Sequence, residues 1–86
     1  MTIQDATATE TRLIALLARM LGRKADALGL DQHLVKDLGI DSVDLLGLVS
    51  GIEEEFDIVL PADGHLISNV KTIRELVALV EEYRAT

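Results

Sequence analysis

Apolar residues recur every three or four positions in three separate stretches of the chain, a spacing that places them on one face of an α-helix. In the first stretch, leucines stand four residues apart between positions 13 and 21. Thr7 and Glu10 precede them with the spacing of a capping box, and Gly22 follows with the conformational freedom that often ends a helix. The pattern predicts a first helix over residues 7–22.

The second stretch begins at Asp41, a typical N-cap residue, with Asp44 three positions further on. We predict that this helix runs to about Glu55 or Phe56. A rotation of about 100° per residue gathers five apolar side chains on one arc, which should face the core. These side chains are Leu45, Leu48, Val49, Ile52 and Phe56.

The opposite arc of the second helix should be exposed to solvent. It carries Val43, Leu46, Gly47, Ser50, Glu53 and Glu54. Because apolar and acidic residues are combined there at the start of an acidic helix, we predict a docking surface for partner proteins, to which Asp44 also belongs. Gly47 and Gly51 each lower helix stability by about 1 kcal/mol relative to alanine. Close packing against another helix, or the approach of a partner or a bound chain, would each account for them.

The third stretch predicts a last helix over residues 72–84, in which Thr72 and Glu75 repeat the spacing of a capping box. Residues 63–69 are predicted to form a short helical turn, and residues 23–40 a long loop with short turns. The predicted fold is therefore all-α, a small four-helix bundle with three main helices, one short helix and a long first loop. A chain of 86 residues suits a single domain, 1–86, with its core at about 7–84.

Composition excludes several functions for this chain. It is 49% hydrophobic but only 2% aromatic, so its core should be aliphatic, and without cysteine it has no disulfide or thiolate metal site. Two histidines are too few to indicate a zinc site. A net charge of −7 opposes binding to nucleic-acid phosphates. Since no apolar run is long enough to span a membrane and no signal peptide is apparent, we expect a cytoplasmic protein without a membrane partner. We also expect a monomer that does not bind nucleic acid.

The negative charge is concentrated in the middle of the chain. Between Lys36 and Val70 there are eight acidic residues and one basic residue. This segment should present a negative field that steers a basic partner toward it, although the same charge also favours solubility.

Ser42 lies between Asp41 and Asp44 in the predicted first turn of the second helix. A phosphate attached there would gain about 0.3–1 kcal/mol from the helix dipole, and the two aspartates would repel it by a comparable amount. An attached group would thus be tolerated but left free to swing. Catalysis by this serine is not indicated, because no histidine is near it in sequence and no Gly-x-Ser-x-Gly motif surrounds it. A first-turn serine can also serve only as a capping residue.

The stretch LVKDLGIDSVDLLGLVSGIEEEFDIVLP, residues 34–61, resembles the acyl carrier proteins of fatty-acid and polyketide synthesis. The matching features are LGIDSVD, the EEEF that closes the second helix, and the proline that follows. The resemblance implies that Ser42 carries covalent 4′-phosphopantetheine, attached from coenzyme A by a phosphopantetheinyl transferase that Asp41 helps to recruit. The terminal thiol of this arm would hold acyl groups as thioesters, so the chain would be a carrier and not an enzyme.

The resemblance also implies that the outer face of the second helix meets acyl-loading, condensing and acyl-transfer enzymes with basic docking patches. Gly47 and Ser50 stand where the fatty-acid carriers usually have glutamate and methionine, which suggests a specialised or polyketide-type carrier. Two alternatives remain open from the sequence. The chain could be an aminoacyl or peptidyl carrier, although Asp41 and the run Glu53–Glu55 favour the acyl branch, or an unmodified acidic module that only binds a protein.

Overall fold

The computed structural model describes residues 6–61 and 69–84, and the regular elements in these residues are helical. They are α1 (Ala6–Leu21), the 3-10 helix η1 (Ala25–Ala27), α2 (Ser42–Phe56) and α4 (Ile73–Arg84). Between 6–61 and 69–84 there is no β-strand, only an isolated bridge that joins His33 to Thr72. The predicted all-α fold with a long first loop is confirmed. The short helix predicted at 63–69 lies outside the described residues, except for its last position.

The first helix begins and ends one residue earlier than predicted. Because α1 starts at Ala6, Thr7 lies inside the helix, and its predicted role as the N-cap is wrong. Alanine has the highest intrinsic helix propensity, which favours this earlier start. At the other end Gly22 has a φ of +66°, and the Arg23 N–H donates to the Ala18 carbonyl at 2.9 Å. The predicted left-handed glycine after the helix is therefore confirmed.

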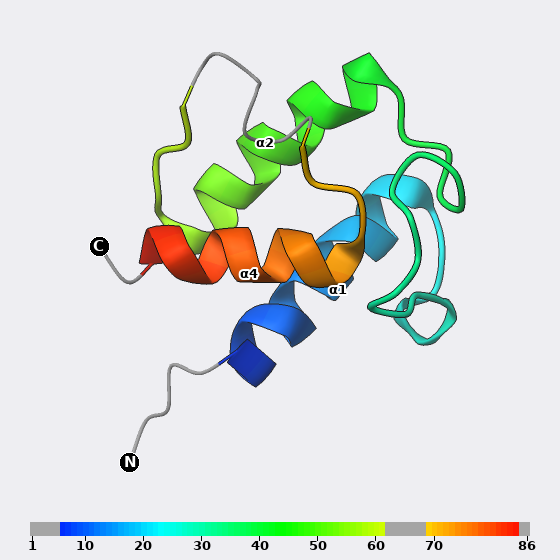
Figure 1. Cartoon of the computed structure of the whole chain (residues 1–86), viewed down its shortest axis with the longest axis horizontal. Helices are drawn as coiled ribbons and strands as arrows, with labels where there is room; N and C mark the ends of the chain where they lie inside the picture. The colour runs from blue at the N-terminus through cyan, green and yellow to red at the C-terminus, as the bar shows by residue number, and fades with distance from the viewer. Residues whose placement is uncertain (1–5, 62–68, 85–86) are drawn as a thin grey trace.

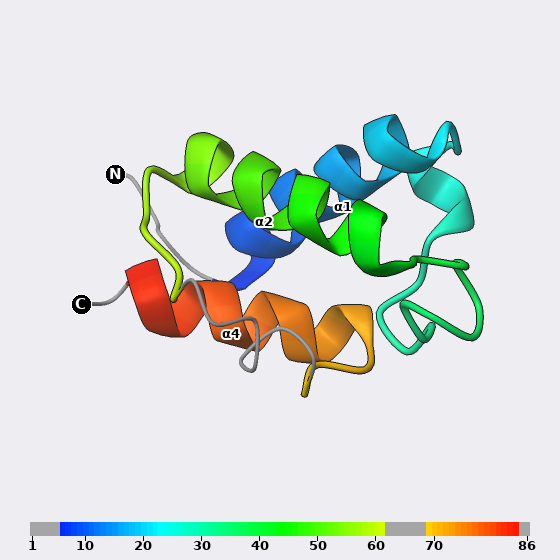
Figure 2. The ribbon, with the colours of Figure 1, turned by 90° about the horizontal axis from the view of Figure 1, so that it is seen from above.

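Helix α1 packs against both α2 and α4 (Figure 1), and Figure 2 shows α4 along one side of the molecule, at the bottom of the picture, with α1 and α2 on the other side. The core between them is aliphatic apart from Phe56, as the composition predicts. The predicted inner arc of α2 is confirmed, with Leu48, Ile52 and Phe56 buried and Leu45 and Val49 packed against the core. The buried apolar residues are Leu13, Leu16, Leu17, Ala18, Leu28, Leu34, Leu38, Ile40, Leu48, Ile52, Phe56, Leu60, Ile73, Leu76, Val77, Leu79 and Val80.

The long loop between α1 and α2 is held in place by hydrogen bonds to the start of α4. The N–H of Ile73 donates to the Gln32 carbonyl at 3.2 Å, and the N–H of Arg74 donates to the Leu30 carbonyl at 2.8 Å. The first N–H groups of a helix have no partner within it, so these loop carbonyls satisfy donors that would otherwise depend on water. The loop thereby becomes part of the framework that positions α2.

The start of α4 also carries the predicted capping box. The Glu75 N–H donates to Thr72 Oγ1, and the Thr72 N–H donates to Glu75 Oε1, both at 3.2 Å. A further N–H, from Lys71, donates to the same carboxylate oxygen at 2.6 Å. The backbone hydrogen bonds from Lys71 and Thr72 hold the pKa of Glu75 below its ordinary value, because they stabilise the ionised form.

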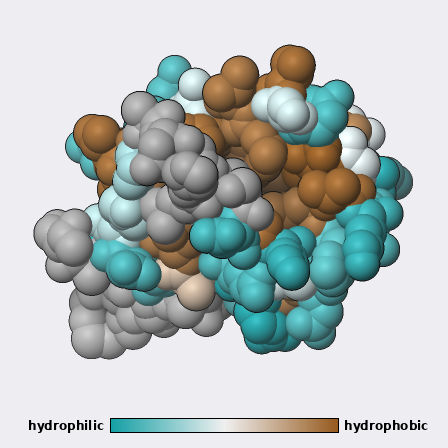
Figure 3. All heavy atoms as spheres, turned by 45° about the horizontal axis from the view of Figure 1, so that its top comes forward, coloured by the Kyte–Doolittle hydropathy of each residue, from teal (hydrophilic) through white to brown (hydrophobic). Residues whose placement is uncertain are grey.

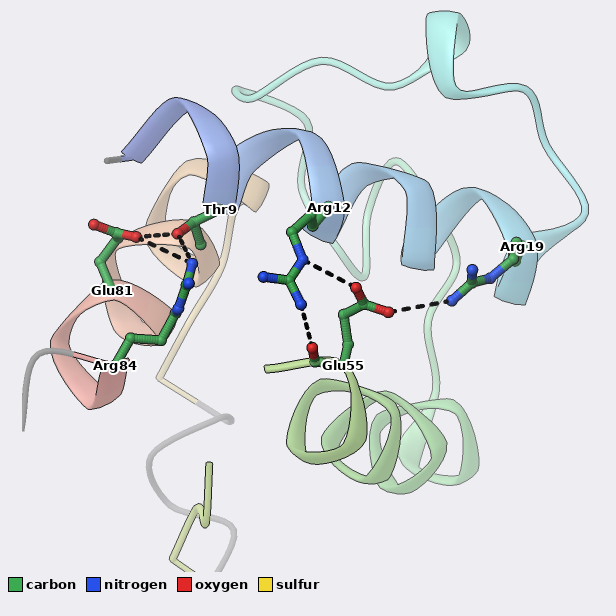
Figure 4. Close-up of polar contacts among 6 residues, drawn as sticks. All are labelled: Thr9, Arg12, Arg19, Glu55, Glu81 and Arg84. Carbon is green, nitrogen blue, oxygen red and sulfur yellow. Dashed lines mark hydrogen bonds and ion pairs between the residues drawn. The ribbon is translucent and has the colours of Figure 1, made fainter. Parts of the chain in front are cut away.

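Two polar clusters join the helices at one end of the molecule (Figure 4). In the first, Arg12 of α1 donates from Nε to Glu55 Oε2 at 3.0 Å and from Nη2 to the Glu55 carbonyl, and its guanidinium lies 4.6 Å from the Phe56 ring centre. In the second, the buried Thr9 hydroxyl donates to Glu81 and accepts from Arg84 Nη1 at 2.7 Å. These contacts join α1 to α2 and α1 to α4.

Candidate functional site

The start of α2 is built by a reciprocal cap, as predicted. Asp41 Oδ1 accepts from the Asp44 N–H at 2.8 Å, and Asp44 Oδ2 accepts from the Asp41 N–H at 3.2 Å. Just before this cap, Gly39 turns the chain with a φ of +70°, and the buried Ile40 anchors it to the core. The helix therefore has to begin at the surface, immediately after an anchored residue.

Ser42 is the first residue of α2, and its side chain is exposed. Its hydroxyl makes no hydrogen bond with the part of the chain that the structure describes, so this side chain does not cap the helix; Asp41 does. No described base contacts this hydroxyl, and an unactivated hydroxyl is a weak nucleophile. Such a group suits the acceptance of a substituent transferred by another enzyme.

The outer arc of α2 is exposed where the sequence predicts it to be. Val43 is 74% exposed and Leu46 is 72% exposed, and both belong to the few large apolar side chains that point into solvent. Gly47, Ser50 and Glu54 are exposed beside them. Their orientation agrees with the predicted docking surface, and their role in docking stays a prediction.

The acidic part of the predicted docking surface is smaller than the sequence suggests. Glu53 is half-buried, because its Oε2 accepts from the Leu60 N–H at 2.8 Å. Glu55 is turned toward Arg12 and Arg19 of α1, at 3.0 and 3.8 Å. Because successive residues of a helix are rotated by about 100°, Glu53, Glu54 and Glu55 point in three different directions. Of these three, only Glu54 is fully exposed to solvent. Sequence reasoning missed these internal partners because Leu60 lies beyond the end of the helix and Arg12 and Arg19 come from α1.

The two glycines of α2 have different surroundings. A Cβ at Gly51 would lie 3.1 Å from Leu16 Cδ1 of α1, which supports the interpretation that this glycine permits close helix packing. A Cβ at Gly47 would have Met20 Cε, at 3.9 Å, as its nearest neighbour. Packing therefore accounts for Gly51 and does not account for Gly47.

The described residues offer neither a metal centre nor a membrane-spanning helix. No group of three or more metal-ligating side chains occurs within residues 6–61 and 69–84. None of the helices described is long and apolar enough to cross a bilayer.

A surface hollow of about 300 Å³, which sequence reasoning missed, lies between the first loop and the segment before α4. Its lining residues are His33, Val35, Lys36, Val70 and Lys71.

Comparison with known proteins shows which class of protein this chain belongs to. Residues 11–80 match the family described as "Phosphopantetheine attachment site", so the match spans most of the chain. The chain is 33% identical over 75 residues to "Acyl carrier protein" of Syntrophobacter fumaroxidans, covering 86% of this chain and 93% of that protein. It is 30% identical over 77 residues to "Acyl carrier protein" of Zymomonas mobilis, covering 90% and 96%. A third relative, "Acyl carrier protein" of Cyanidium caldarium, is 39% identical over 64 residues, covering 73% and 74%.

The chain belongs to the acyl carrier protein family, as the resemblance of residues 34–61 implied. Members of this family are carriers and not catalysts, and their cofactor is covalently attached 4′-phosphopantetheine. The exposed hydroxyl of Ser42 at the start of α2 is compatible with such a group, and the assignment of the group to this residue stays a prediction. When attached, the group supplies a terminal thiol that can hold an acyl chain as a thioester.

Proposed function

We propose that Ser42 carries the 4′-phosphopantetheine arm and that the chain holds acyl or polyketide intermediates on it for delivery to partner enzymes. The observation that carries this proposal is the exposed hydroxyl at the capped start of α2, free of any hydrogen bond to the described residues. Asp41 holds the helix start in place, so the hydroxyl is presented on a rigid element. We propose that Asp41 also contributes to recognition by the transferase.

In the proposed modification, the phosphopantetheinyl transferase supplies both coenzyme A and the base. The Ser42 oxygen forms a bond to the phosphorus that bears pantetheine, and the pyrophosphate P–O bond of coenzyme A breaks. Adenosine 3′,5′-bisphosphate leaves, and the serine proton passes to the transferase. This chain contributes the acceptor hydroxyl and its placement, and it needs no base of its own.

The partners that we propose are the transferase and enzymes of acyl loading, condensation and acyl transfer. A net charge of −7 would attract enzymes with basic docking patches, and the exposed Glu54 can meet a basic side chain directly. We further propose that residues 1–86 form one carrier domain that acts as a monomer in the cytoplasm. Gly47 and Ser50, which differ from the usual residues of the fatty-acid carriers, support a specialised or polyketide-type role.

Intact mass spectrometry after incubation with coenzyme A and a broad-specificity transferase tests this proposal. We expect the chain to gain the mass of one phosphopantetheinyl group, and Ser42→Ala to gain nothing. Ser50→Ala is the matched control, because Ser50 is an exposed serine on the same helix, and at completion this variant should still gain the full mass even if docking there slows the reaction. A gain that persists in Ser42→Ala, or no gain in the unsubstituted chain, would overturn the assignment and favour an unmodified binding module. Mass spectrometry of the carrier recovered from its native cell, with its cargo still attached, distinguishes an acyl cargo from an aminoacyl or peptidyl one.

A further inference from the structure

The surface hollow between the first loop and the segment before α4 combines apolar and basic side chains. Val35 and Lys36 line it from the loop, Val70 and Lys71 line it from the other segment, and His33 completes it. Its volume of about 300 Å³ lies at the lower end of the range that proteins use to bind small molecules. The hollow can therefore take a short chain of a few carbon atoms.

The two walls of this hollow are held in place by the backbone and by acidic side chains. The Leu34 N–H donates to the Lys71 carbonyl at 2.8 Å, which joins one wall to the other. Asp37 Oδ2 accepts from the His33 N–H at 2.7 Å, and Glu75 Oε1 accepts from the Lys71 N–H at 2.6 Å. The nearby carboxylates are thus used to build the walls, and the hollow is a preformed part of the framework.

Two lysines line the hollow in a chain whose net charge is −7. Lys36 and Lys71 are exposed, and neither forms an ion pair with a residue in 6–61 or 69–84. Over the same ranges, four arginines are paired with carboxylates. Two unpaired ammonium groups from separate segments therefore stand beside two valines. This combination matches a ligand with a short apolar chain and a free carboxylate.

The hollow is close enough to Ser42 for an attached arm to reach it. The Ile40 N–H donates to the Leu34 carbonyl at 3.0 Å, so the loop wall passes beside the residue that anchors the start of α2. Ser42 follows Ile40 by two residues, which separates their Cα atoms by at most about 7 Å. Pantetheine alone is comparable in length to an extended peptide of about four residues, roughly 13 Å. An acyl group on its thiol can therefore reach the hollow.

The charge of the hollow, and not its apolar area, sets it apart from the rest of the surface. Figure 3 shows hydrophobic side chains gathered on the side of the molecule along which α2 runs, where Val43 and Leu46 are 74% and 72% exposed. Helix α2 contains no basic residue. An uncharged acyl chain gains as much from that surface as from the hollow, whereas an acyl chain that ends in a carboxylate favours the hollow.

We propose that this hollow binds the free carboxylate of a dicarboxylic acyl group carried on the arm. The acyl chain lies against Val35 and Val70, and its carboxylate lies between the ammonium groups of Lys36 and Lys71. Because both lysines are exposed, the contact is weak, which suits a cargo that has to be released to the next enzyme. This inference names the class of cargo and rests on the proposed function of Ser42.

Two cargoes of equal chain length test this inference. The transferase loads the unmodified chain from glutaryl coenzyme A or from pentanoyl coenzyme A, which has a methyl group where glutaryl has its free carboxylate. Two-dimensional NMR then follows the backbone amides of Val35, Lys36 and Lys71. Relative to the form with an empty arm, we expect glutaryl to shift these signals at least about threefold more than pentanoyl does. About 0.5 M NaCl should reduce the difference.

The pKa of the glutaryl carboxyl group provides a second measurement, by carbon NMR on a labelled carboxyl. In the hollow this pKa should be lower than in free glutaryl pantetheine, because two cations stabilise the ionised form. Elsewhere on this acidic chain the negative field would raise it. A variant with both Lys36→Gln and Lys71→Gln should lose the lowered pKa and the amide shifts. Lys24→Gln is the matched control, because Lys24 is an exposed lysine that does not line the hollow, and it should keep both.

Circular dichroism checks that each variant is folded, and the other outcomes are decisive. Equal amide shifts for the two cargoes, a raised carboxyl pKa, or shifts that persist in the double variant would overturn the inference and leave Ser42 as the modified residue. Shifts that grow with protein concentration would indicate contact between copies of the chain and would overturn it too. Failure of Ser42 to accept any pantetheine group would overturn the proposed function and this inference with it.

Discussion

Gly47 and Gly51 lie one turn apart on α2 and have the same intrinsic cost in a helix, but the space around them differs. A Cβ at position 47 meets nothing closer than Met20 Cε at 3.9 Å, which is ordinary van der Waals contact. A Cβ at position 51 meets Leu16 Cδ1 at 3.1 Å, and Leu16 is buried in the core. The same substitution should therefore have different effects on stability at the two sites.

We expect Gly47→Ala to raise the free energy of unfolding by about 1 kcal/mol, because alanine loses less backbone entropy in a helix. For a domain of this size that is a rise in melting temperature of about 4–8 °C. Gly51→Ala should gain less or lose stability, since Leu16 has to move. Thermal unfolding followed by circular dichroism measures both variants. An equal rise for the two would mean that the contact with Leu16 has no energetic weight.

At the scale of the helices, α2 is tied to α1 by two arginines that differ in geometry. Arg12 makes two hydrogen bonds to Glu55 and lies over the Phe56 ring, whereas Arg19 reaches Glu55 only at 3.8 Å and is 68% exposed. Arg12→Ala should lower the free energy of unfolding by about 2 kcal/mol, because it removes charge-assisted hydrogen bonds and a cation–π contact. Arg19→Ala, the matched control, should change it by less than about 0.5 kcal/mol. Urea unfolding measures the free energy of unfolding of both variants. Equal losses would contradict the view that Arg12 contributes more than Arg19 to holding α2 against α1.

The capped start of α4 should make stability depend on pH. Backbone hydrogen bonds from Lys71 and Thr72 lower the pKa of Glu75, so its contribution is fully present above the pKa of the unfolded chain, near 4.5. It is lost as the pH falls through the still lower pKa of the folded state. Glu75→Gln should therefore reduce stability near pH 7 and make it less dependent on pH below about 4.5. Urea unfolding from pH 7 to pH 3 measures this, and parallel curves for the two proteins would contradict it.

The helices were largely predictable because their signals are local. Asp41 and Asp44 are three residues apart, as are Thr72 and Glu75, and both pairs form the caps that their spacing predicts. The polar clusters were not predictable, because their members meet only after folding. Thr9 and Glu81 are 72 positions apart, and no local pattern indicates that the buried hydroxyl will find that carboxylate.

The candidate site shows the same division between local and distant signals. The exposure of Ser42, Val43 and Leu46 follows from helical rotation, which the sequence contains. The positions of Glu53 and Glu55 depend on Leu60 and Arg12, which come from other segments. The predicted docking surface contained Glu53 and Glu54, and only Glu54 is fully exposed, so the prediction overstated the charge that this surface presents to solvent.

At the scale of the whole molecule, the proposed attachment serine and the core are separate. The buried side chains come mainly from the inner faces of α1, α2 and α4 and from the first loop, whereas Ser42 stands on the surface at the start of α2. No buried contact has to change when a group is attached there. The fold should therefore be nearly independent of modification, which is useful in a carrier that is repeatedly loaded and emptied.

We expect the unmodified and phosphopantetheinylated chains to differ by less than about 1 kcal/mol in free energy of unfolding, because the gain of the phosphate from the helix dipole is offset by repulsion from Asp41 and Asp44. Asp44→Asn should disturb this balance. The substitution weakens the cap and removes one carboxylate in both forms. Only the modified form also loses a repulsion, because only there does a phosphate face that carboxylate. The modified variant should then be more stable than the unmodified variant by up to about 1 kcal/mol. Urea unfolding of the four proteins isolates this coupling, and a coupling that persists unchanged in 1 M NaCl would show that its origin is not electrostatic.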